Sequence, residues 1–337
     1  MAATLKDVAS LAGVSIKTVS NVVNGYDFVK PENRRKVLAA LEATGYRPHR
    51  GARNLRRGRT GFIALVLPEL NIPYFAELTG LIITAAHHHE WGVLIEQTQG
   101  TRSQERTALA SMGPYLIDGA IVSPQALEAA DFAELSPAVP LVLLGEHAVD
   151  VPFDHVAIDN VRAARTAVGH LAQIGRRRIA AIGHNPHRGT AALRLTGYRE
   201  ALAEANIPER SELIVTALEY HRRDGAEAMN HLLDLPEPPD AIFCFNDLLA
   251  LGAMRKAAER GLRIPEDLAI VGFDNTEEST FSIPSLTTIA PNKSAIAQTA
   301  VDLLRRRATE SFPTQDIQIP FTLEIRESTS TLPTRPV

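Results

Sequence analysis

From Gly61 onward, short apolar runs of strand length alternate with longer segments that have helical periodicity. The runs are FIALVLP, GVLIEQ, GAIVSP, PLVLLG, RIAAIGH, LIVTA, AIFCFN and LAIVGFDN, and helical spacing occurs over 76–88, 103–112, 161–174, 191–205 and 248–260. Such alternation predicts parallel sheets that are covered by helices on both faces. About 277 residues are ample for two subdomains of this kind.

Polar residues follow many of these runs, and ligands of open α/β sheets bind beyond the carboxyl ends of the strands. The residues in such places are Asn71 to Phe75, Ser123, Glu146, His184, Asn246, Asp247, Asp274 and Asn275. Taken singly, Asn and Asp at these places are usually turn or cap residues, and we expect this of Asp247 and Asn275. As a group around one crevice, the residues suit a neutral, hydroxyl-rich ligand better than an apolar one.

The first 60 residues differ from the rest in charge. They hold twelve Lys and Arg against four Asp and Glu, a net charge of +8, whereas the remainder holds 23 against 35, a net charge of −12. A basic head on an acidic body indicates a polyanion-binding module joined to a body with another role. A solvated basic face is the alternative that charge alone leaves open.

Apolar spacing in this head predicts three short helices. Thr4, with Asp7 three residues later, and Ser15 stand at the starts of the first two helices as N-caps, and Gly13 falls at the turn between them. The apolar stripe of the first helix is Leu5, Val8, Ala9 and Ala12, and that of the second is Val19, Val22 and Val23. A third helix, from Pro31 to Gly45, is expected to bury Val37, Leu38 and Leu41. Two helices joined by a tight glycine-containing turn make a helix-turn-helix.

The second helix of a helix-turn-helix lies in the major groove of DNA, where its N-terminal residues meet base edges. Ile16 suits a thymine methyl group, Lys17 suits guanine and Asn21 suits adenine. Short polar side chains that suit phosphate oxygens are Ser15, Thr18, Ser20 and Asn24. A small three-helix packing unit without a DNA role is the alternative reading of these residues.

The stretch YRPHRGARNLRRGRTG, from Tyr46 to Gly61, carries six arginines and a histidine with almost no core material. This composition is typical of a linker. A leucine among arginines, Leu55, suits a wedge pressed into the minor groove, with the cations on the flanking phosphates. A plain basic tether would explain the arginines but would leave Leu55 without a role.

The segments TLKDVASLAGVSIKTVSNVVNG and VKPENRRKVLAALEATGYRPHRGARNLRRGRTGFIALVLP resemble the LacI/GalR family of bacterial transcriptional regulators, and the resemblance covers essentially the whole chain. It implies a homodimer that binds a pseudo-palindromic operator in double-stranded DNA. Leu55 of each chain would enter the minor groove at the centre, and Arg56 would reach the groove beside it. The resemblance also assigns base reading to Ile16, Lys17 and Asn21, and it adds Thr4, Leu5 and Tyr46 to the DNA-binding residues.

In the body, the segments IPYFAEL, VAIDN, RGTAALRLTGYREAL, FCFNDLLALGAM, IPEDLAIVGFDN and PSLTTIAPNKSAIAQTAVDLL resemble the effector-binding domain of that family, a type I periplasmic-binding-protein fold. The implied effector contacts are Tyr74, Phe75, Arg188, Thr190, Arg194, Asn246 and Asp274. An Arg–Asp pair can satisfy vicinal hydroxyls, and the two aromatic rings offer a flat apolar wall. The sequence departs from the family at Gly145, which Glu146 follows, and where Glu219 or Tyr220 stands for a stacking aromatic.

From this resemblance we expect a head with its hinge over residues 1–60, the hinge at about 49–59, and an effector-binding and dimerisation domain over 61–337. The N-subdomain would cover about 61–159 and 290–318, and the C-subdomain about 160–289 and 319–337. The C-terminus lacks the leucine heptads of a tetramerising coiled coil, so a dimer is expected. No secretion signal and no run of membrane-spanning length is present in the sequence, which favours a cytoplasmic protein without a membrane partner.

The sequence does not show the catalytic residues that an enzyme would need. Cys244, the single cysteine, lies in an apolar run and indicates a buried thiol, and the adjacent histidines of AHHHEWG lack the spacing of a zinc helix. We therefore expect no enzyme activity, no cofactor and no metal. The sequence favours a repressor of carbohydrate-utilisation genes whose operator affinity is switched by a small sugar-like effector. The alternatives are a periplasmic-type sugar-binding transport protein and a regulator that answers to a non-sugar effector such as a nucleobase.

Overall fold

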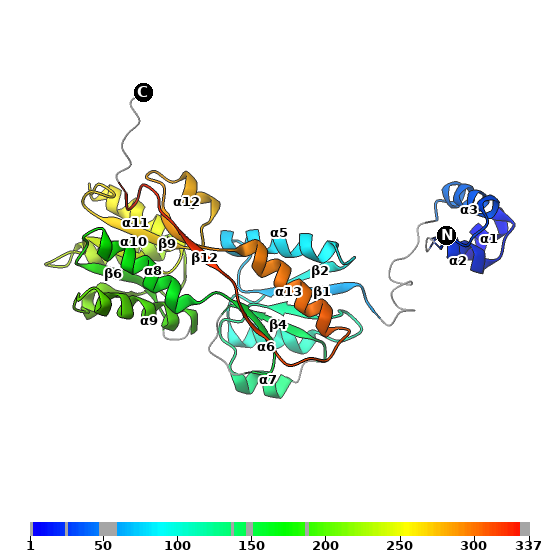
Figure 1. Ribbon diagram of the computed structural model, residues 1–337, viewed down its shortest axis with the longest axis horizontal. Helices are drawn as coiled ribbons and strands as arrows, with labels where there is room; N and C mark the ends of the chain where they lie inside the picture. The colour runs from blue at the N-terminus through cyan, green and yellow to red at the C-terminus, as the bar shows by residue number, and fades with distance from the viewer. Residues whose placement is uncertain are drawn as a thin grey trace, which may run out of the picture. The chain divides into compact units, whose positions relative to one another are not determined.

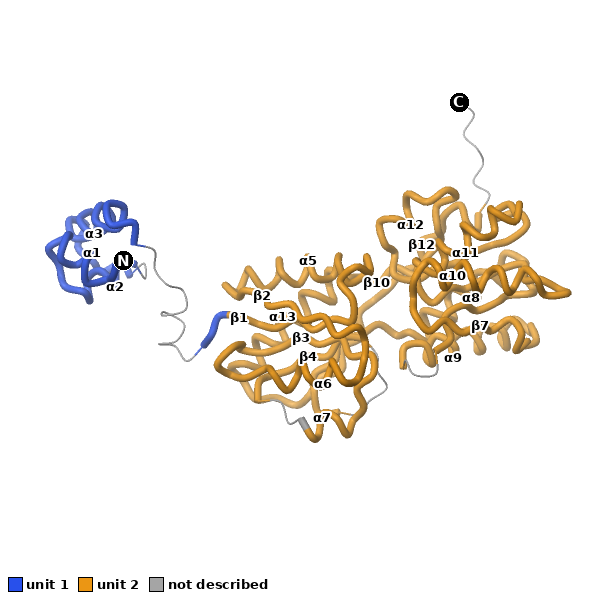
Figure 2. The backbone as a smooth tube through the Cα atoms, turned by 180° about the vertical axis from the view of Figure 1, so that it is seen from behind, with its two compact units in different colours: residues 1–61 blue, residues 62–337 orange. Residues whose placement is uncertain are grey.

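The computed structural model of the chain describes residues 3–23, 26–46, 59–135, 138–145, 151–185 and 189–330. The predictions for Asn24, Leu55, Arg56, Glu146 and Arg188 fall outside the described residues. The chain divides into two compact units, residues 1–61 and 62–337 (Figure 2). In the described part of the chain, the helices are all too short or too polar to cross a membrane.

The first unit contains three helices, α1 (Leu5–Ala12), α2 (Ile16–Val23) and α3 (Pro31–Thr44). The predicted cap of α1 is confirmed: Thr4 Oγ1 accepts the backbone N–H of Asp7 at 3.4 Å, and the backbone N–H of Thr4 donates to the Asp7 carboxylate at 2.8 Å. Gly13 ends α1 in the left-handed region, with a φ of 65°, which a residue with a side chain rarely adopts. The small core of the unit consists of Val8, Ala9, Ala12, Val19, Val22, Val29, Val37 and Ala40.

The prediction that Leu38 is buried is wrong, because its side chain is 53% exposed. At about 100° of rotation per residue, Val37, Ala40 and Leu41 lie close together on the helix surface. Val37 and Ala40 are buried in the core and Leu41 packs against it. Leu38 falls to the side of this arc and faces solvent.

The second unit contains two six-stranded sheets, ordered β11-β5-β4-β3-β1-β2 and β12-β10-β9-β8-β6-β7. The strands are β1 (Phe62–Leu67), β2 (Gly92–Gln97), β3 (Ala120–Val122), β4 (Leu141–Leu144), β5 (Asp154–Ala157), β6 (Ile179–His184), β7 (Ile214–Thr216), β8 (Ala241–Cys244), β9 (Ala269–Phe273), β10 (Thr287–Pro291), β11 (Asp316–Gln318) and β12 (Phe321–Glu324). The described strand pairs are parallel except for β12, which runs antiparallel to β10 at the sheet edge. The predicted parallel sheets are therefore confirmed.

Helices cover both faces of each sheet (Figure 1). They are α5 (Pro73–His87), α6 (Arg102–Ser111), α7 (Ala129–Leu135), α8 (Asn160–Gln173), α9 (Gly189–Glu204), α10 (Arg222–Leu233), α11 (Asp247–Glu259), α12 (Glu277–Phe281) and α13 (Lys293–Arg307). We call the first sheet with α5, α6, α7 and α13 the first lobe, and the second sheet with α8 to α12 the second lobe. The chain passes between the lobes at residues 158–159, 292 and 319–320.

Helices α10 and α11 approach each other closely at two glycines. A Cβ atom on Gly225 would lie 2.1 Å from the carbonyl oxygen of Leu249, and one on Gly252 would lie 1.9 Å from that of Arg222. Both distances are far below van der Waals contact, and both neighbours are backbone atoms that a rotamer change cannot move. The absence of side chains at these two positions therefore allows the helix pair to pack.

Candidate functional site

Helix α2 carries the residues predicted to read bases. Ile16 is 49% exposed, Lys17 is exposed and Asn21 is half-buried. At about 100° per residue these three side chains fall within about 140° of arc. The side chains of Val19 and Val22 lie on the opposite side of the helix and are buried in the head core. The arrangement presents one polar and one aliphatic group to solvent from the first turn of an exposed helix.

The hydroxyls at the start of α2 are engaged with the helix itself. Ser15 Oγ accepts the backbone N–H of Thr18 at 3.1 Å and lies 2.9 Å from Thr18 Oγ1, which confirms Ser15 as the cap. Leu5 and Tyr46 are half-buried and pack against the head core. The DNA contacts predicted for these residues, for Thr4 and for the half-buried Ser20 remain predictions.

In the second unit, the carboxyl ends of both sheets line one cavity. Its lining consists of Ile72, Tyr74, Phe75, Leu78, Ser123, Gln125, Leu144, Gly145, Val156, Ala157, Ile158, Asn160, Thr190, Arg194, Tyr220, Asn246, Phe273, Asp274, Pro291 and Ile296. The space in which the centre of a water molecule can lie is about 110 Å³. One water needs only about 10–15 Å³ by this measure, so the cavity has room for a small organic ligand.

Aromatic rings from the two lobes form part of the apolar lining. At the start of α5, the ring centroids of Tyr74 and Phe75 lie 5.2 Å apart in an edge-to-face arrangement, with an interplanar angle of 74°. Phe273, the last residue of β9, contributes from the second lobe. Burial raises the pKa of the Tyr74 hydroxyl, so this group stays protonated at neutral pH.

Arg194 on α9 is held in place by the fold before any ligand binds. Its Nε donates to Asn160 Oδ1 at 2.9 Å, and its Nη1 donates to the carbonyl oxygen of Phe245. The guanidinium carbon lies 3.5 Å from the ring centroid of Phe273. A buried arginine with these contacts has little freedom to change its orientation, which is what a specific hydrogen-bond donor requires.

Asp274 follows β9 and is only 9% exposed. Its backbone is left-handed, with a φ of 113°, and its N–H donates to the carbonyl oxygen of Ile289 at 2.9 Å. Burial raises the pKa of its carboxyl to about 8, while the charge of Arg194 acts in the opposite direction. The carboxyl can therefore accept or donate a hydrogen bond near neutral pH.

Asn246 lines the cavity, but its amide also serves the fold. Its Oδ1 accepts the N–H of Leu249 at 2.8 Å as the cap of α11, and its Nδ2 donates to the carbonyl oxygen of Tyr220 at 3.0 Å. The hydroxyl of Tyr220 donates to the carbonyl oxygen of Gly183 at 2.6 Å. Of the two residues left open by the sequence, Tyr220 lines the cavity and Glu219 is exposed.

Other strand-end residues lie outside the lining. Asp247 accepts the N–H of Thr276 at 2.8 Å and the hydroxyl of Thr288 at 2.6 Å, and Asn275 has a left-handed φ of 49°, so both are structural, as expected. His184 ends β6 and does not line the cavity.

Sequence reasoning missed several lining residues, among them Gln125, Asn160 and Phe273. Two of these stand in quoted motifs: Asn160 ends VAIDN, and Phe273 directly precedes Asp274. Their positions next to polar strand-end residues were the available signal.

One group of potential metal ligands occurs among the described residues: Glu69, Glu219 and His221, whose ligand atoms lie within 4.8 Å of one another. His221 Nε2 is 3.4 Å from Glu69 Oε2, so these two side chains already contact each other. Glu219 is exposed, and groups of exposed acidic side chains commonly occur without a metal ion.

Two family models match the chain. Residues 4–49 match the bacterial regulatory proteins of the lacI family, and residues 168–329 match a periplasmic binding protein-like domain. Over 305 residues the chain is 37% identical to the HTH-type transcriptional repressor CytR of Escherichia coli strain K12, which covers 90% of this chain and 89% of that repressor.

Solved structures agree with this result. The lac repressor dimer bound to operator and the anti-inducer ONPF matches with a TM-score of 0.88 at 28% identity, over 98% of this chain and 100% of that one. A complex of the transcriptional regulator CelR with cellobiose matches with a TM-score of 0.71 at 31% identity, over 97% and 99%. These relatives are named as repressors or regulators of transcription. The matches extend over both the head and the body of this chain.

Proposed function

The chain belongs to the lacI family of bacterial regulatory proteins, and from this premise we propose that it is a cytoplasmic repressor whose affinity for a DNA operator is switched by a small sugar-like effector. The observation that carries the proposal is the cavity between the two lobes, in a chain that also holds a helix-turn-helix head. Arg194 and Asp274 line this cavity beside the rings of Tyr74 and Phe75. The protein acts by binding and carries out no catalysis.

The operator is pseudo-palindromic and is bound by a homodimer. A second copy would meet the edge strand β2, where Leu94 and Ile95 are 37% and 40% exposed beside the open edge of the sheet. The lac repressor dimer bound to operator is a precedent in a relative for a homodimer on DNA. In each head, Ile16, Lys17 and Asn21 read bases, while Leu55 and Arg56 reach the minor groove.

The effector is a sugar because the polar groups of the cavity complement hydroxyls. The guanidinium of Arg194 donates and the carboxyl of Asp274 accepts, which together satisfy two neighbouring hydroxyls. The aromatic rings suit the apolar face of a sugar ring. Cellobiose in the CelR complex is a precedent in a relative. A nucleobase is the second candidate, because a buried carboxyl with a pKa of about 8 can also donate to a ring nitrogen.

Effector and operator are linked through the relative position of the two lobes. An effector can change the free energy of operator binding by no more than the difference between its own binding free energies for the two lobe positions. A coupling free energy of about 1–3 kcal/mol is typical.

Removal of residues 1–61 tests this division of labour. The truncated chain should keep its thermal shift with the same sugar or nucleoside that stabilises the full chain, because ligands of the native state raise apparent stability. It should fail to enrich any sequence from a random DNA pool, whereas the full chain should enrich a pseudo-palindrome. Equal enrichment by both chains would refute the DNA-binding role of the head. A nucleoside that stabilises the chain when no sugar does would favour the second candidate.

A further inference from the structure

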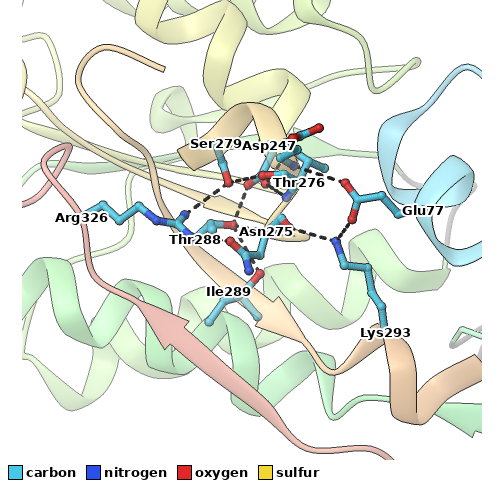
Figure 3. Close-up of polar contacts among 10 residues, drawn as sticks. Glu77, Asp247, Asn275, Thr276, Ser279, Thr288, Ile289, Lys293 and Arg326 are labelled. Atoms are coloured by element: carbon cyan, nitrogen blue, oxygen red, sulfur yellow. Dashed lines mark hydrogen bonds and ion pairs between the residues drawn. The ribbon is translucent and has the colours of Figure 1, made fainter. Parts of the chain in front are cut away.

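Residues 274–277 comprise the loop that follows β9 and the first residue of α12, and they are contacted by side chains from both lobes (Figure 3). The segment begins with Asp274, which faces the cavity, and it leads directly into α12. We call this segment the 274–277 loop. Its contacts fall into two sets, one from each lobe.

The second lobe fixes the shape of the loop. Besides the bond from Asp274 N–H to Ile289, the N–H of Thr276 donates to Asp247, and Arg326 Nη2 donates to Asn275 Oδ1 at 2.6 Å. These bonds hold Asp274 and Asn275 in left-handed conformations that residues with side chains seldom adopt. The loop is therefore part of the second lobe.

The first lobe reaches the same loop through two side chains, Glu77 of α5 and Lys293 of α13. Lys293 Nζ donates to the carbonyl oxygen of Asn275 at 2.9 Å and also pairs with the carboxylate of Glu77. The other oxygen of that carboxylate accepts the N–H of Glu277 at 3.2 Å. Figure 3 shows the two side chains meeting from different helices beside the loop.

The positions of these two residues in the fold connect the contact to the cavity. Glu77 lies within one turn of Tyr74 and Phe75 on α5, so the helix that carries one wall of the cavity also carries this contact. Lys293 is the first residue of α13, directly after Asn292, where the chain crosses between the lobes. A movement of the lobes about this crossing would change the distance from Glu77 and Lys293 to the loop.

The environment of the pair suits a contact that forms and breaks. The side chain of Lys293 is 12% exposed and that of Glu77 is 34% exposed. In such a half-buried ion pair, the lost hydration of the charges offsets most of the attraction between them. Lys293 without Glu77 would be a poorly hydrated charge, so the two residues should act as a unit.

We infer that Glu77 and Lys293 form a latch that positions the 274–277 loop, and with it Asp274, against α5. The latch thereby couples the cavity lining to the relative position of the two lobes. The link to regulation rests on the proposed function. The latch itself is a property of the chain without effector or DNA. Glu77 and Lys293 are positioning residues, since neither lines the cavity.

A second contact between the lobes provides a matched control. Glu69, which follows β1, lies 3.4 Å from His221 at the start of α10. This pair also crosses between the lobes, but among the described residues neither side chain hydrogen-bonds to the 274–277 loop. Glu69→Gln should therefore change only the relative position of the lobes, whereas the latch variants should also destabilise the conformation of the 274–277 loop.

The test uses the full chain without ligand and measures two quantities. Cysteines introduced for Ala110 on α6 and Ala203 on α9, both exposed, accept spin labels that report the distance between the lobes. The native Cys244 is fully buried and burial raises the pKa of its thiol, so it should not compete for the label. Hydrogen exchange of the amides of residues 275–279 reports the loop.

Glu77→Gln and Lys293→Met should each broaden the distance distribution and speed loop exchange roughly tenfold. Lys293→Met removes the donor to Asn275, and Glu77→Gln removes the charge that strengthens the bonds from Glu277 and Lys293. The double variant should go little further than either single one. Glu69→Gln should leave loop exchange unchanged, and so should Glu259→Gln, which removes the partner of Lys256 on α11 at a distance from the loop.

Two results would overturn the latch. One is an unchanged distance distribution in both single variants. The other is a set of exchange effects that add independently in the double variant, which would make Glu77 and Lys293 separate structural contacts. Glu77→Gln preserves the shape of the side chain and carries the test if Lys293→Met fails to fold. Neither readout involves DNA or effector, so a failure here and a failure of the proposed function are distinguishable.

Discussion

Arg194 and Phe273 are stacked in the wall of the cavity, with the guanidinium carbon 3.5 Å from the ring centroid. The same guanidinium bonds Asn160 and the carbonyl oxygen of Phe245. The fold therefore uses the plane of the guanidinium and donors on Nε and Nη1, which are two of the five N–H donors that the group carries. A lysine in this place would keep the charge alone.

We expect Arg194→Lys to lower the free energy of unfolding by about 1–3 kcal/mol, since buried bonds from a charged donor are lost. Urea unfolding of the full chain would measure the change. Arg162→Lys is the control, because Arg162 also lies over a ring, that of Phe321 at 5.0 Å, while its side chain is 57% exposed. A loss for Arg162→Lys as large as for Arg194→Lys would show that stacking alone, without the buried bonds, determines the effect.

Asp274 makes the stability of the fold depend on pH. Burial raises the pKa of its carboxyl to about 8, with Arg194 and Lys293 acting against this and Asp247 and Glu77 in its favour. The folded chain holds this proton more tightly than the unfolded chain, whose carboxyl has a pKa of about 3.9. The contribution to stability is thus fully present below pH about 4 and is lost as the pH rises through about 8.

Asp274→Asn removes this titration. We expect the variant and the native chain to unfold at similar urea concentrations near pH 4.5 or below, roughly the unfolded pKa. Near neutral pH the variant should be more stable by about 2–4 kcal/mol, with the gap growing up to about pH 8. Asp234→Asn, a surface carboxylate directly after α10 that is 58% exposed and pairs with Arg260, is the control and should give a constant offset. A gap that stays constant across this range would contradict a raised pKa for Asp274.

Sequence patterns predicted much of the fold because the central strands are unbroken apolar runs. The short strand β5 was missed, since it contains Asp154 and His155 and presents no such run. The edge strands β11 and β12 are short and partly exposed, and their sequences resemble loops. Leu38 was misassigned because apolar character shows which side chains can be buried, whereas the packing of α1 against α3 determines which are.

The cavity was predictable to the extent that it follows strand ends. Asn246 and Asp274 stand directly after apolar runs, Tyr74 lies in the segment that follows β1, and all three line the cavity. The bond from Arg194 to Asn160 joins residues that are 34 positions apart, and nothing in either local pattern indicates it. The same holds for Glu77 and Lys293, which are 216 positions apart. Contacts of this kind depend on the tertiary arrangement of whole helices.

Gly252 should be among the least replaceable residues of the second lobe. A Cβ atom there would lie 1.9 Å from the carbonyl oxygen of Arg222, so alanine must push α10 and α11 apart. Overpacking of this kind costs about 1–3 kcal/mol. Thermal unfolding of Gly252→Ala should show the loss, and Gly169→Ala on α8, where a Cβ would meet nothing within 4 Å, is the control. Gly169→Ala should be neutral or stabilising, because alanine has a higher helix propensity than glycine.

The last prediction concerns base reading by α2. Lys17 and Asn21 share the exposed side of the helix with Ile16, and we expect each to discriminate at particular operator positions by about 1–3 kcal/mol. Selection from a random DNA pool with Lys17→Ala and with Asn21→Ala should relax the preference at one position in each half-site, at different positions for the two variants. Ser20→Ala on α2 is the control, since Ser20 is predicted to contact phosphate, and loss of a phosphate contact weakens binding to all sequences alike. If Lys17→Ala and Asn21→Ala also weaken binding uniformly, then the exposed side of α2 holds the backbone of DNA and does not read its sequence.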